Sequence, residues 1–454
     1  MHSAPGGDAR RIDMLRVIAL IALLSAPAHA QDFFTLKGHG GPIMDIAVSP
    51  SGRIATASFD NAVGLWDGSN PTWLDGHEAA VNVVEFVGTA SLVSAGDDFS
   101  VRFWQTPTVG QVLGLHKGKV MSLAISRTAG MIASASWDGT IGLWALPAEA
   151  NGGIVPVRAD PAPLFLKGHR QGVNDVVFGA DGQTLYSAST DGTIRKWDVT
   201  NGAETQLLVS HGFGINELIL NEEDGWLAYG AVDGGVRLID PQTGSEIGDF
   251  TLDRRPILSL TYNSSTRLLA VGDGDGYIMM IDTENMVITR DFQAARTGPI
   301  WALAFSPDGQ NIHAGGIENI VYSWPVETIR EYDQMSGESQ SFLEAPETLG
   351  NGERQFKRKC SICHTLTESS ARRAGPTLYQ LFGRKAGTVS DYRYSETLTG
   401  SDIVWSPETI NDLFDEGPDH YIPGTKMPMQ RIAGADDRTD LIEYLRTATN
   451  GGRN

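Results

Sequence analysis

Seven copies of one pattern, mostly 38 to 43 residues apart, fill the chain between residues 32 and 327. The fourth copy reads "LKGHRQGVNDVVFGADGQTLYSASTDGTIRKWD"; the first three align with it, and three weaker copies follow. In each copy an acidic residue precedes an apolar residue by six positions, and five copies have a histidine 21 or 22 positions before that acid. The pairs are Asp60/Trp66, Asp98/Trp104, Asp138/Trp144, Asp191/Trp197, Asp233/Ile239, Asp275/Ile281 and Glu318/Trp324, and the histidines are His39, His77, His116, His169 and His211. A fixed period predicts a repeat protein in which each copy is one supersecondary unit.

Each copy has the pattern of short strands. Apolar and polar residues alternate, as in "VNDVVF" and "TLYSAST", and the dipeptides DG and DN mark hairpin turns. Helical periodicity is absent from the copies. Three or four strands in each of seven copies predict an all-β propeller of seven four-stranded blades over residues 32–327. The one long step carries the insert "LPAEANGGIVPVRADPAP", which we expect to be a surface loop.

The two ends of the repeat predict how the ring closes. The segment "DFFTL" precedes the first copy and has the place of an outer strand, whereas the last copy ends at "VYSWPV" without one. We therefore expect Phe33–Leu36 to complete the seventh blade beside Val321–Trp324. This pairing joins the first and last blades and leaves no open sheet edge.

The Gly-His and Trp-Asp pairs resemble those of the WD-repeat family over residues 32–327. In that family the matching His, Ser and Asp residues form a structural hydrogen-bond network with the Trp. In the fourth copy His169, Ser187 or Ser189, and Asp191 could instead be read as a hydrolase triad. A nucleophile site occurs once in a fold, whereas this set recurs copy after copy, so we expect the structural role.

A second stretch of the repeat resembles a ligand site. The sequence "GDGDGYI" at 272–278 looks like a calcium-binding loop. It falls where the other copies have their turn, and it lacks the Glu that an EF-hand places at its twelfth position. We therefore expect a strand-to-strand turn there.

The first 30 residues have the pattern of an export signal. Three arginines precede the apolar run "VIALIALL", and "SAPAHA" then supplies the small residues that a signal peptidase requires. We expect cleavage between Ala30 and Gln31, and therefore a protein exported to the periplasm of a Gram-negative bacterium. The alternative is an uncleaved anchor, but the run is short for a bilayer core of about 30 Å.

The chain carries 35 basic and 55 acidic residues and a net charge of −20. This balance argues against nucleic-acid binding, which requires an excess of Lys and Arg to neutralise phosphates.

A linker and a second domain follow the repeat. Residues 328–349 are polar and acidic and read as a linker with a short helix near its start. Over residues 350–450 we expect a small all-α domain. Gly352, Phe356 and Cys360 share one face of its first helix, and Leu441, Tyr444 and Leu445 form the apolar stripe of its last helix.

Both cysteines of the chain lie in "KCSICH", where Cys360, Cys363 and His364 form a Cys-x-x-Cys-His motif. This motif attaches c-type haem, with two thiols for the vinyl groups and a His for the iron. A zinc site would require a second pair of ligands. A thioredoxin-like pair would follow a strand and begin a helix, whereas this motif ends one. We therefore expect one covalently bound haem c with its iron.

The rest of this domain resembles the class I cytochromes c of mitochondria and alphaproteobacteria through "AGPTLYQLFGRKAGTVSDYRYS", "IVWSPETI" and "YIPGTKM". The resemblance implies an axial ligand pair, His364 and Met427, with Met429 as the alternative thioether. Other positions carry implied roles: Pro376 accepts the His364 N–H, Thr425 supports the Met loop, Arg384, Tyr394 and Trp405 lie on the propionate side, Gly352 packs against Tyr444 and Leu445, and Phe414 stands where the family often has Tyr.

Residues 351–454 carry 14 basic and 14 acidic side chains, so the excess negative charge lies in the preceding part of the chain. The signs are partly segregated, because the stretch from Asp402 to Asp419 holds six of the 14 acids and no Lys or Arg. Class I cytochromes c dock through a basic ring around the haem edge. We expect this ring to meet an acidic redox partner or to fold back on the propeller, unless it is simply a solvated surface. The basic cluster comprises Arg354, Lys357, Arg358, Lys359, Arg372, Arg373, Arg384 and Lys385.

These features together favour a periplasmic electron carrier whose propeller is a scaffold for a protein partner. Its expected redox partner is a respiratory complex or a periplasmic dehydrogenase. Two alternatives stay open: a fused redox enzyme whose propeller binds a substrate or second cofactor, and a sensor or assembly factor. No single copy shows a concentrated set of unusual polar residues, as a catalytic site would.

Overall fold

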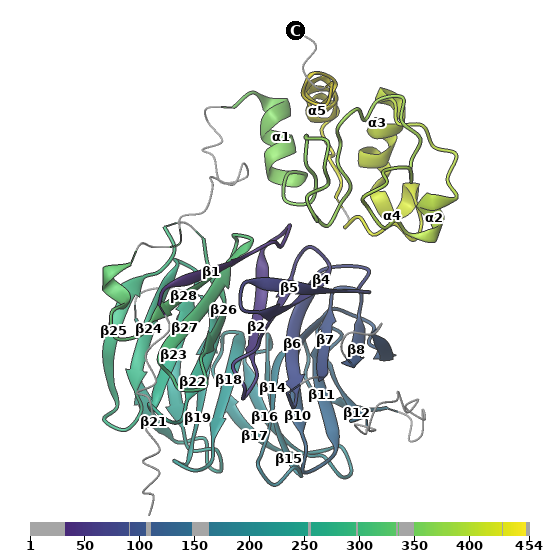
Figure 1. Ribbon diagram of the computed structural model, residues 1–454. Helices are drawn as coiled ribbons and strands as arrows, with labels where there is room; N and C mark the ends of the chain where they lie inside the picture. The colour runs from purple at the N-terminus through teal and green to yellow at the C-terminus, as the bar shows by residue number, and fades with distance from the viewer. Residues whose placement is uncertain are drawn as a thin grey trace, which may run out of the picture.

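The seven copies fold into seven four-stranded antiparallel sheets arranged as a ring, with a small helical domain beside one end of it (Figure 1). This computed structural model describes residues 32–89, 91–105, 110–147, 163–252, 256–296, 298–332, 335, 349–428 and 430–450. The expected export signal, most of the insert and Met429 lie outside the described residues.

Each blade runs through four strands in chain order, except the last. The first blade has β2 (Ile43–Val48), β3 (Ile54–Ser58), β4 (Ala62–Asp67) and β5 (Asn70–Asp75); the second β6 (Val81–Val87), β7 (Ser91–Gly96), β8 (Ser100–Gln105) and β9 (Gln111–Leu115); the third β10 (Val120–Ser126), β11 (Met131–Ser136), β12 (Thr140–Ala145) and β13 (Leu164–Lys167); the fourth β14 (Val173–Phe178), β15 (Thr184–Ser189), β16 (Thr193–Asp198) and β17 (Ala203–Ser210). The fifth has β18 (Ile215–Asn221), β19 (Trp226–Ala231), β20 (Val236–Ile239) and β21 (Glu246–Asp249); the sixth β22 (Ile257–Asn263), β23 (Leu268–Asp273), β24 (Tyr277–Asp282) and β25 (Val287–Gln293); the seventh β26 (Ile300–Phe305), β27 (Asn311–Gly316) and β28 (Ile320–Pro325).

The seventh blade is completed from the other end of the chain, as predicted. Strand β1 (Phe34–Lys37) pairs antiparallel with β28, with Phe34 opposite Ser323 and Leu36 opposite Val321. Leu36 is buried at this seam against residues of the first and last blades. The ring is therefore closed by strand pairing, and the outer edge of the last blade is covered.

The repeated residues form the expected hydrogen-bond network in the first four blades. In blade four, His169 Nδ1 lies 3.0 Å from Asp191 Oδ2 and its Nε2 lies 2.7 Å from Ser187 Oγ, which also accepts the Trp197 N–H at 2.8 Å. Ser189 bonds the Gly172 carbonyl instead and is not part of this set. In each of these four blades the network connects the segment before the first strand to the Trp of the third strand. Similar distances are found in blades one to three. The predicted structural role is therefore confirmed.

The weaker copies depart from this network. In blade five, His211 bonds Asp233 through Nε2, and Tyr229 stands in place of the Ser. In blade six no histidine precedes Asp275 at the usual spacing, and the backbone N–H groups of Asp275 and Tyr277 donate to Asp273, which stands at the strand position that Ser189 has in blade four. The turn between β23 and β24 lies where the stretch "GDGDGYI" predicts one.

The first strand of every blade faces the central channel of the ring. Four carboxylates project into this channel from β2, β6, β14 and β18. Burial raises the pKa of Glu85 to about 8 and that of Asp45 and Asp175 to about 6, and it raises the pKa of Glu217 well above its usual range. Arg127 is the one basic residue among the described residues that line the channel.

After β28 the chain makes the short 3-10 helix η1 (Ile329–Glu331), in agreement with the short helix expected at the start of the linker. The second domain then has α1 (Asn351–Lys359), α2 (Glu396–Thr399), α3 (Pro407–Glu416), α4 (Pro418–Tyr421) and α5 (Ala435–Ala448). Helices α1 and α5 cross at Gly352, where a Cβ atom would lie 2.0 Å from the Asp440 carbonyl oxygen and 2.9 Å from Tyr444 Cβ. Only glycine permits this close crossing, as expected from the sequence.

Among the residues that the structure describes, no helix is both long enough and apolar enough to cross a bilayer.

Candidate functional site

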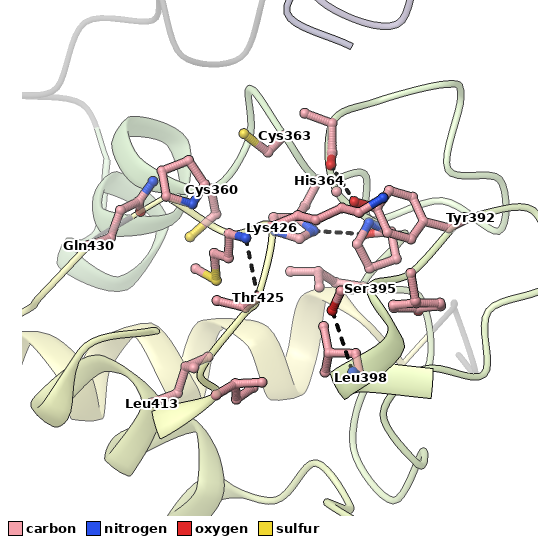
Figure 2. A pocket seen from close by; sticks show the side chains of 18 of the residues that line it. Cys360, Cys363, His364, Tyr392, Ser395, Leu398, Leu413, Thr425, Lys426 and Gln430 are labelled. Atoms are coloured by element: carbon pink, nitrogen blue, oxygen red, sulfur yellow. Dashed lines mark hydrogen bonds between the residues drawn. The ribbon is translucent and has the colours of Figure 1, made fainter. Parts of the chain in front are cut away.

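The second domain encloses a deep, largely apolar cavity with about 1290 Å³ of empty space, counting the solvent at its mouth. The end of α1, the loop 374–398, α3 and the loop 422–430 form its walls. Figure 2 shows Cys360, Cys363, His364 and Thr425 around this cavity.

The two cysteines lie at the end of α1, where the helix closes in one tight turn. The backbone N–H groups of Cys363 and His364 both donate to the Cys360 carbonyl, at 3.0 and 2.9 Å. Burial raises the pKa of the Cys360 thiol to about 12 and that of Cys363 to about 11. A redox-active cysteine requires a lowered pKa, so the geometry disfavours the thioredoxin-like alternative.

His364 is fixed in orientation and tautomer. Its Nδ1 donates to the Pro376 carbonyl at 2.7 Å, and because a carbonyl only accepts, this nitrogen carries the proton. Burial lowers the pKa of His364, which keeps the ring neutral. A Cβ atom on Gly375 would lie 2.4 Å from His364 Cε1, so the loop backbone holds the ring closely. The remaining Nε2 is left as the lone-pair atom that can bind a metal.

Met427 approaches the cavity from the loop that follows α4. Its backbone N–H donates to Thr425 Oγ1 at 3.2 Å, and Thr425 N–H in turn donates to the Ile422 carbonyl. Thr425 therefore holds the turn that carries Met427, the position implied for it. Phe414 is buried in the cavity wall and offers no hydroxyl to the Met427 sulfur.

The three residues implied on the propionate side line the same cavity. The Arg384 guanidinium donates to the carbonyls of Tyr379 at 2.6 Å and Thr377 at 2.7 Å. Trp405 is held next to it, because its backbone N–H donates to the Arg384 carbonyl. Burial raises the pKa of Tyr394, so its hydroxyl is a hydrogen-bond donor at neutral pH.

Two residues of the cavity were missed by the sequence reasoning. Tyr392 packs edge-on against Tyr394 with ring centroids 4.9 Å apart and donates to the Ala374 carbonyl. Gln430 lies in the wall with its buried side-chain oxygen unpaired. The alternation in "DYRYS" could have indicated Tyr392, because residues two apart in an extended segment share one face. No local signal indicates Gln430.

These residues fit a covalently bound haem. Two thiols one turn apart, a neutral imidazole with its Nε2 available and a thioether on a supported loop are the donor types for c-type attachment and axial ligation. The apolar walls suit the porphyrin faces, and the unpaired Gln430 amide offers a polar group to whatever fills the cavity.

The propeller forms part of the wall at the mouth of this cavity. Phe59, Asn61, Ala79, Ala80 and Asp97, from the first two blades, line it together with the residues of the second domain. A Cβ atom on Gly40 would lie 2.2 Å from the Arg372 carbonyl carbon, so the two backbones touch. The two domains therefore meet at the cavity. Figure 1 shows the helical domain beside one end of the propeller.

Ion pairs join the domains across this mouth. Arg372 Nη2 lies 2.7 Å from Asp75 Oδ1, and Lys426 Nζ lies 2.7 Å from Glu78 Oε2. Arg393 Nη2 lies 3.8 Å from Glu78 Oε1. The expectation that the basic surface folds back on the propeller is confirmed in part. Of the eight predicted cations only Arg372 forms a described ion pair with the propeller, while Lys357 and Lys385 pair with acids of their own domain.

Comparison with known proteins agrees with both halves of the structure. The family profile named Cytochrome c matches residues 349–449. The profile named WD domain, G-beta repeat matches 31–67, 69–105, 108–145, 163–198 and 287–324. The repeats left unmatched are those whose Trp is replaced by Ile239 and Ile281.

Cytochrome c of Nigella damascena is 38% identical over 110 residues, which cover 24% of this chain and 98% of that protein. Cytochrome c of Theileria parva is 42% identical over 99 residues, 22% of this chain and 84% of that protein. The crystal structure of the WD40 beta propeller domain of Doa1 superposes with a TM-score of 0.56 at 22% identity, covering 67% of this chain and 98% of that one, which supports the fold alone.

Fold and site thus define a seven-bladed WD-repeat propeller joined to a class I cytochrome c domain. Through that domain the chain belongs to the cytochrome c family, and it binds haem c covalently with its iron. A cytochrome c domain carries electrons, and a WD-repeat propeller is a scaffold for protein interactions.

Proposed function

We propose that this protein is a periplasmic carrier of single electrons, with Cys360 and Cys363 attaching the haem and with His364 and Met427 as axial ligands. The observation that carries this proposal is that His364, fixed by Pro376, and Met427, whose loop is held by Thr425, line the same cavity. When bound, the haem supplies one-electron chemistry at an iron whose potential His/Met ligation raises.

The surrounding residues keep that chemistry outer-sphere. Pro376 holds the imidazole in the tautomer that presents Nε2, and Thr425 holds the thioether loop. Buried apolar side chains, among them Leu381, Ile410 and Leu413, keep water out of the cavity. With both axial positions taken, neither oxygen nor a substrate has an open site, so added imidazole should bind weakly.

A pair of variants tests the ligand assignment. Met427→Ala in the full chain should lower the reduction potential and allow imidazole to bind tightly, because the loss of the thioether opens one axial position. Met429→Ala is the matched control, two residues away, and should change neither the potential nor imidazole binding. Reversed results would assign Met429 as the ligand, and a high-spin ferric spectrum in the unaltered protein would contradict His/Met ligation altogether.

Quantitation of cofactors tests the carrier role. One c-haem per chain and no further chromophore support an electron carrier. A second chromophore, or turnover of a small-molecule substrate linked to haem reduction, would support the enzymatic alternative instead.

Cleavage of the expected signal peptide tests the proposed periplasmic location. The pattern of residues 1–30 supports export, and N-terminal sequencing of the mature protein from a periplasmic fraction should begin at Gln31. Recovery of the uncleaved chain in the membrane fraction would support the anchor alternative. Redox partners are expected among respiratory complexes or dehydrogenases of the same compartment.

A further inference from the structure

Three cations of the cytochrome c domain, one of which lines the haem cavity, meet one short stretch of the propeller. Arg372, Arg393 and Lys426 come from three separate segments of the cytochrome c domain, and Lys426 directly precedes Met427. All three contact Asp75 or Glu78, which lie at and just after the end of β5. The propeller thus places two carboxylates against the basic residues beside the haem.

Aromatic packing reinforces the ion pairs. The Arg372 guanidinium lies over the Trp73 ring, 4.4 Å from its centroid. Trp73 in turn packs edge-on against Trp66 at 5.7 Å and His39 at 4.7 Å, so the stack rests on the rigid core of blade one. A planar guanidinium stacks in this way, whereas an ammonium does not share its geometry.

The backbone of the cytochrome c domain adopts an unusual conformation where it contacts the propeller. Ala371 and Arg372 have φ angles of 48° and 53°, a left-handed conformation that residues with a Cβ seldom adopt. The same two residues approach Gly40, where any larger residue would clash with their backbone. Strain of this kind persists only where surrounding contacts hold it in place. Here Gly40 and Trp73 of the propeller supply such contacts, together with the bond from the Ala371 N–H to Ser369 Oγ within the domain.

We propose that Trp73, Asp75 and Glu78 form a built-in docking surface for the haem edge, and that a redox partner reaches the haem by displacing this surface with an acidic face of its own. This inference rests on the proposed electron-carrier function. It identifies the kind of partner by charge: a protein that offers carboxylates to Arg372, Arg393 and Lys426.

The contact between the two domains is weak enough for an external partner to displace it. Asp75 and Glu78 are 59% and 46% exposed in their side chains, and exposed ion pairs are individually weak and screened by salt. Residues 326–349 join the two domains, and linkage of this kind gives a high effective concentration that lets a weak contact stay formed. An external partner in sufficient concentration can still compete for the same cations.

Carbodiimide cross-linking of the full-length holoprotein tests the contact. The reagent should join Lys426 to Glu78 through an amide, detected as a linked peptide by mass spectrometry. The cross-linked protein should be reduced by ascorbate, a small molecule, at its normal rate. It should lose most of its rate with reduced flavodoxin, used as an acidic electron-transfer protein. Absence of the linked peptide, or equal flavodoxin rates before and after cross-linking, would overturn the proposal.

Charge removal on the propeller provides the complementary test, because it leaves the haem domain unaltered. The double variant Asp75→Asn/Glu78→Gln should accelerate reduction by flavodoxin about three- to tenfold at low ionic strength, since the open fraction rises as two weak pairs are lost. The double variant Asp67→Asn/Glu223→Gln changes the net charge equally, at exposed acids outside the contact, and should show only a small general charge effect. Equal acceleration in both variants would contradict the proposal.

The two proposals fail in different ways. If the haem is reduced by ascorbate and has a His/Met spectrum in all variants, the electron-carrier function stands whatever the flavodoxin rates show. If ascorbate fails to reduce the haem reversibly, the carrier function itself is wrong.

Discussion

His169 in blade four of the propeller and His364 in the cytochrome c domain are both partly buried, and burial lowers the pKa of both rings. Each has its Nδ1 bonded to an oxygen, Asp191 in one case and the Pro376 carbonyl in the other. They differ at Nε2. In His169 this nitrogen bonds Ser187, and the corresponding bond is found in blades one to three. His364 instead lines the cavity of the cytochrome c domain.

This difference distinguishes a structural histidine from a histidine that can bind a metal. A buried histidine with both nitrogens bonded to protein atoms is complete and can only stabilise. One that lines a cavity and has a single nitrogen bonded to protein, as His364 does, has a coordination position left over. The predictions below therefore remove members of each kind and compare haem binding with stability.

The largest effect is expected from Cys360→Ser/Cys363→Ser. Because no other cysteine exists in the chain, covalent haem should be lost completely, as a gel stained for haem under denaturing conditions would show. The β-sheet unfolding transition of the propeller, followed by circular dichroism, should stay within about 1 kcal/mol of the unaltered protein, since distant sites usually act independently. Covalent haem in this variant would contradict the assignment of the attachment site.

The channel carboxylates predict a pH effect on the propeller alone. Burial, and then repulsion from Asp45 and Asp175, raise the pKa of Glu85 to about 8, so the folded state binds a proton that the unfolded state releases near pH 4. Stability should therefore fall as pH rises from about 4 toward 8. Glu85→Gln should remove part of this slope and raise the free energy of unfolding at pH 8 by about 2 to 5 kcal/mol.

Urea unfolding at pH 5 and pH 8 measures the effect of Glu85→Gln. Asp45, Asp175 and Glu217 face the same channel and shift in the same direction, so some pH dependence should persist in the variant. Glu223→Gln, at an exposed acid outside the channel, is the control and should leave the slope unchanged. A variant that is less stable than the unaltered protein at pH 8 would show that the Glu85 charge is compensated.

Removal of one repeated histidine should cost stability and nothing else. His169→Ala takes a partner from the buried Ser187 hydroxyl, and we expect a loss of about 1–3 kcal/mol in the free energy of unfolding. His211→Ala in blade five should cost less, because its acid Asp233 is 25% exposed and no Ser or Trp completes the set. Haem content should be unchanged in both, and a loss of haem in either would connect the network to the site.

The smallest effect is expected at the contact between the domains. Arg372→Gln removes one ion pair and one cation–π stack, worth about 1 kcal/mol together at an exposed site. The radius of gyration from small-angle X-ray scattering at low salt should increase modestly, and Arg358→Gln, an exposed cation without a described partner, should leave it unchanged. An unchanged value for Arg372→Gln would show that Lys426 and Arg393 hold the contact alone.

Repetition explains why much of the propeller could be predicted. Each blade confirms the others, so the alignment located the histidines, the acids and the Trp, and the unmatched strand at each end indicated the pairing of β1 with β28. The alignment was less informative in the weaker copies, where Tyr229 stands in place of the Ser in blade five and no histidine pairs with Asp275 in blade six.

The residues of the haem site could be predicted from the sequence for a different reason. The short motif around Cys360 and its resemblance to a known family indicated the residues that the structure brings together on one cavity. The contact of Lys426 with Glu78 had no such signal, since it joins two surfaces far apart in sequence whose geometry depends on the complete fold. Charge segregation predicted the general area and the sign of this contact but not the partners.

The pairing of β1 with β28 also has a consequence for how the chain folds. These strands lie at opposite ends of the propeller sequence, and contacts with such long sequence separation form slowly. Until β28 has been made, the inner strands of the early blades and the edge of β1 have no final neighbours, which exposes them to aggregation. The helices of the cytochrome c domain pack within one short segment of the chain, as α1 does against α5. We therefore expect ring closure, rather than the haem domain, to limit the rate at which the whole protein matures.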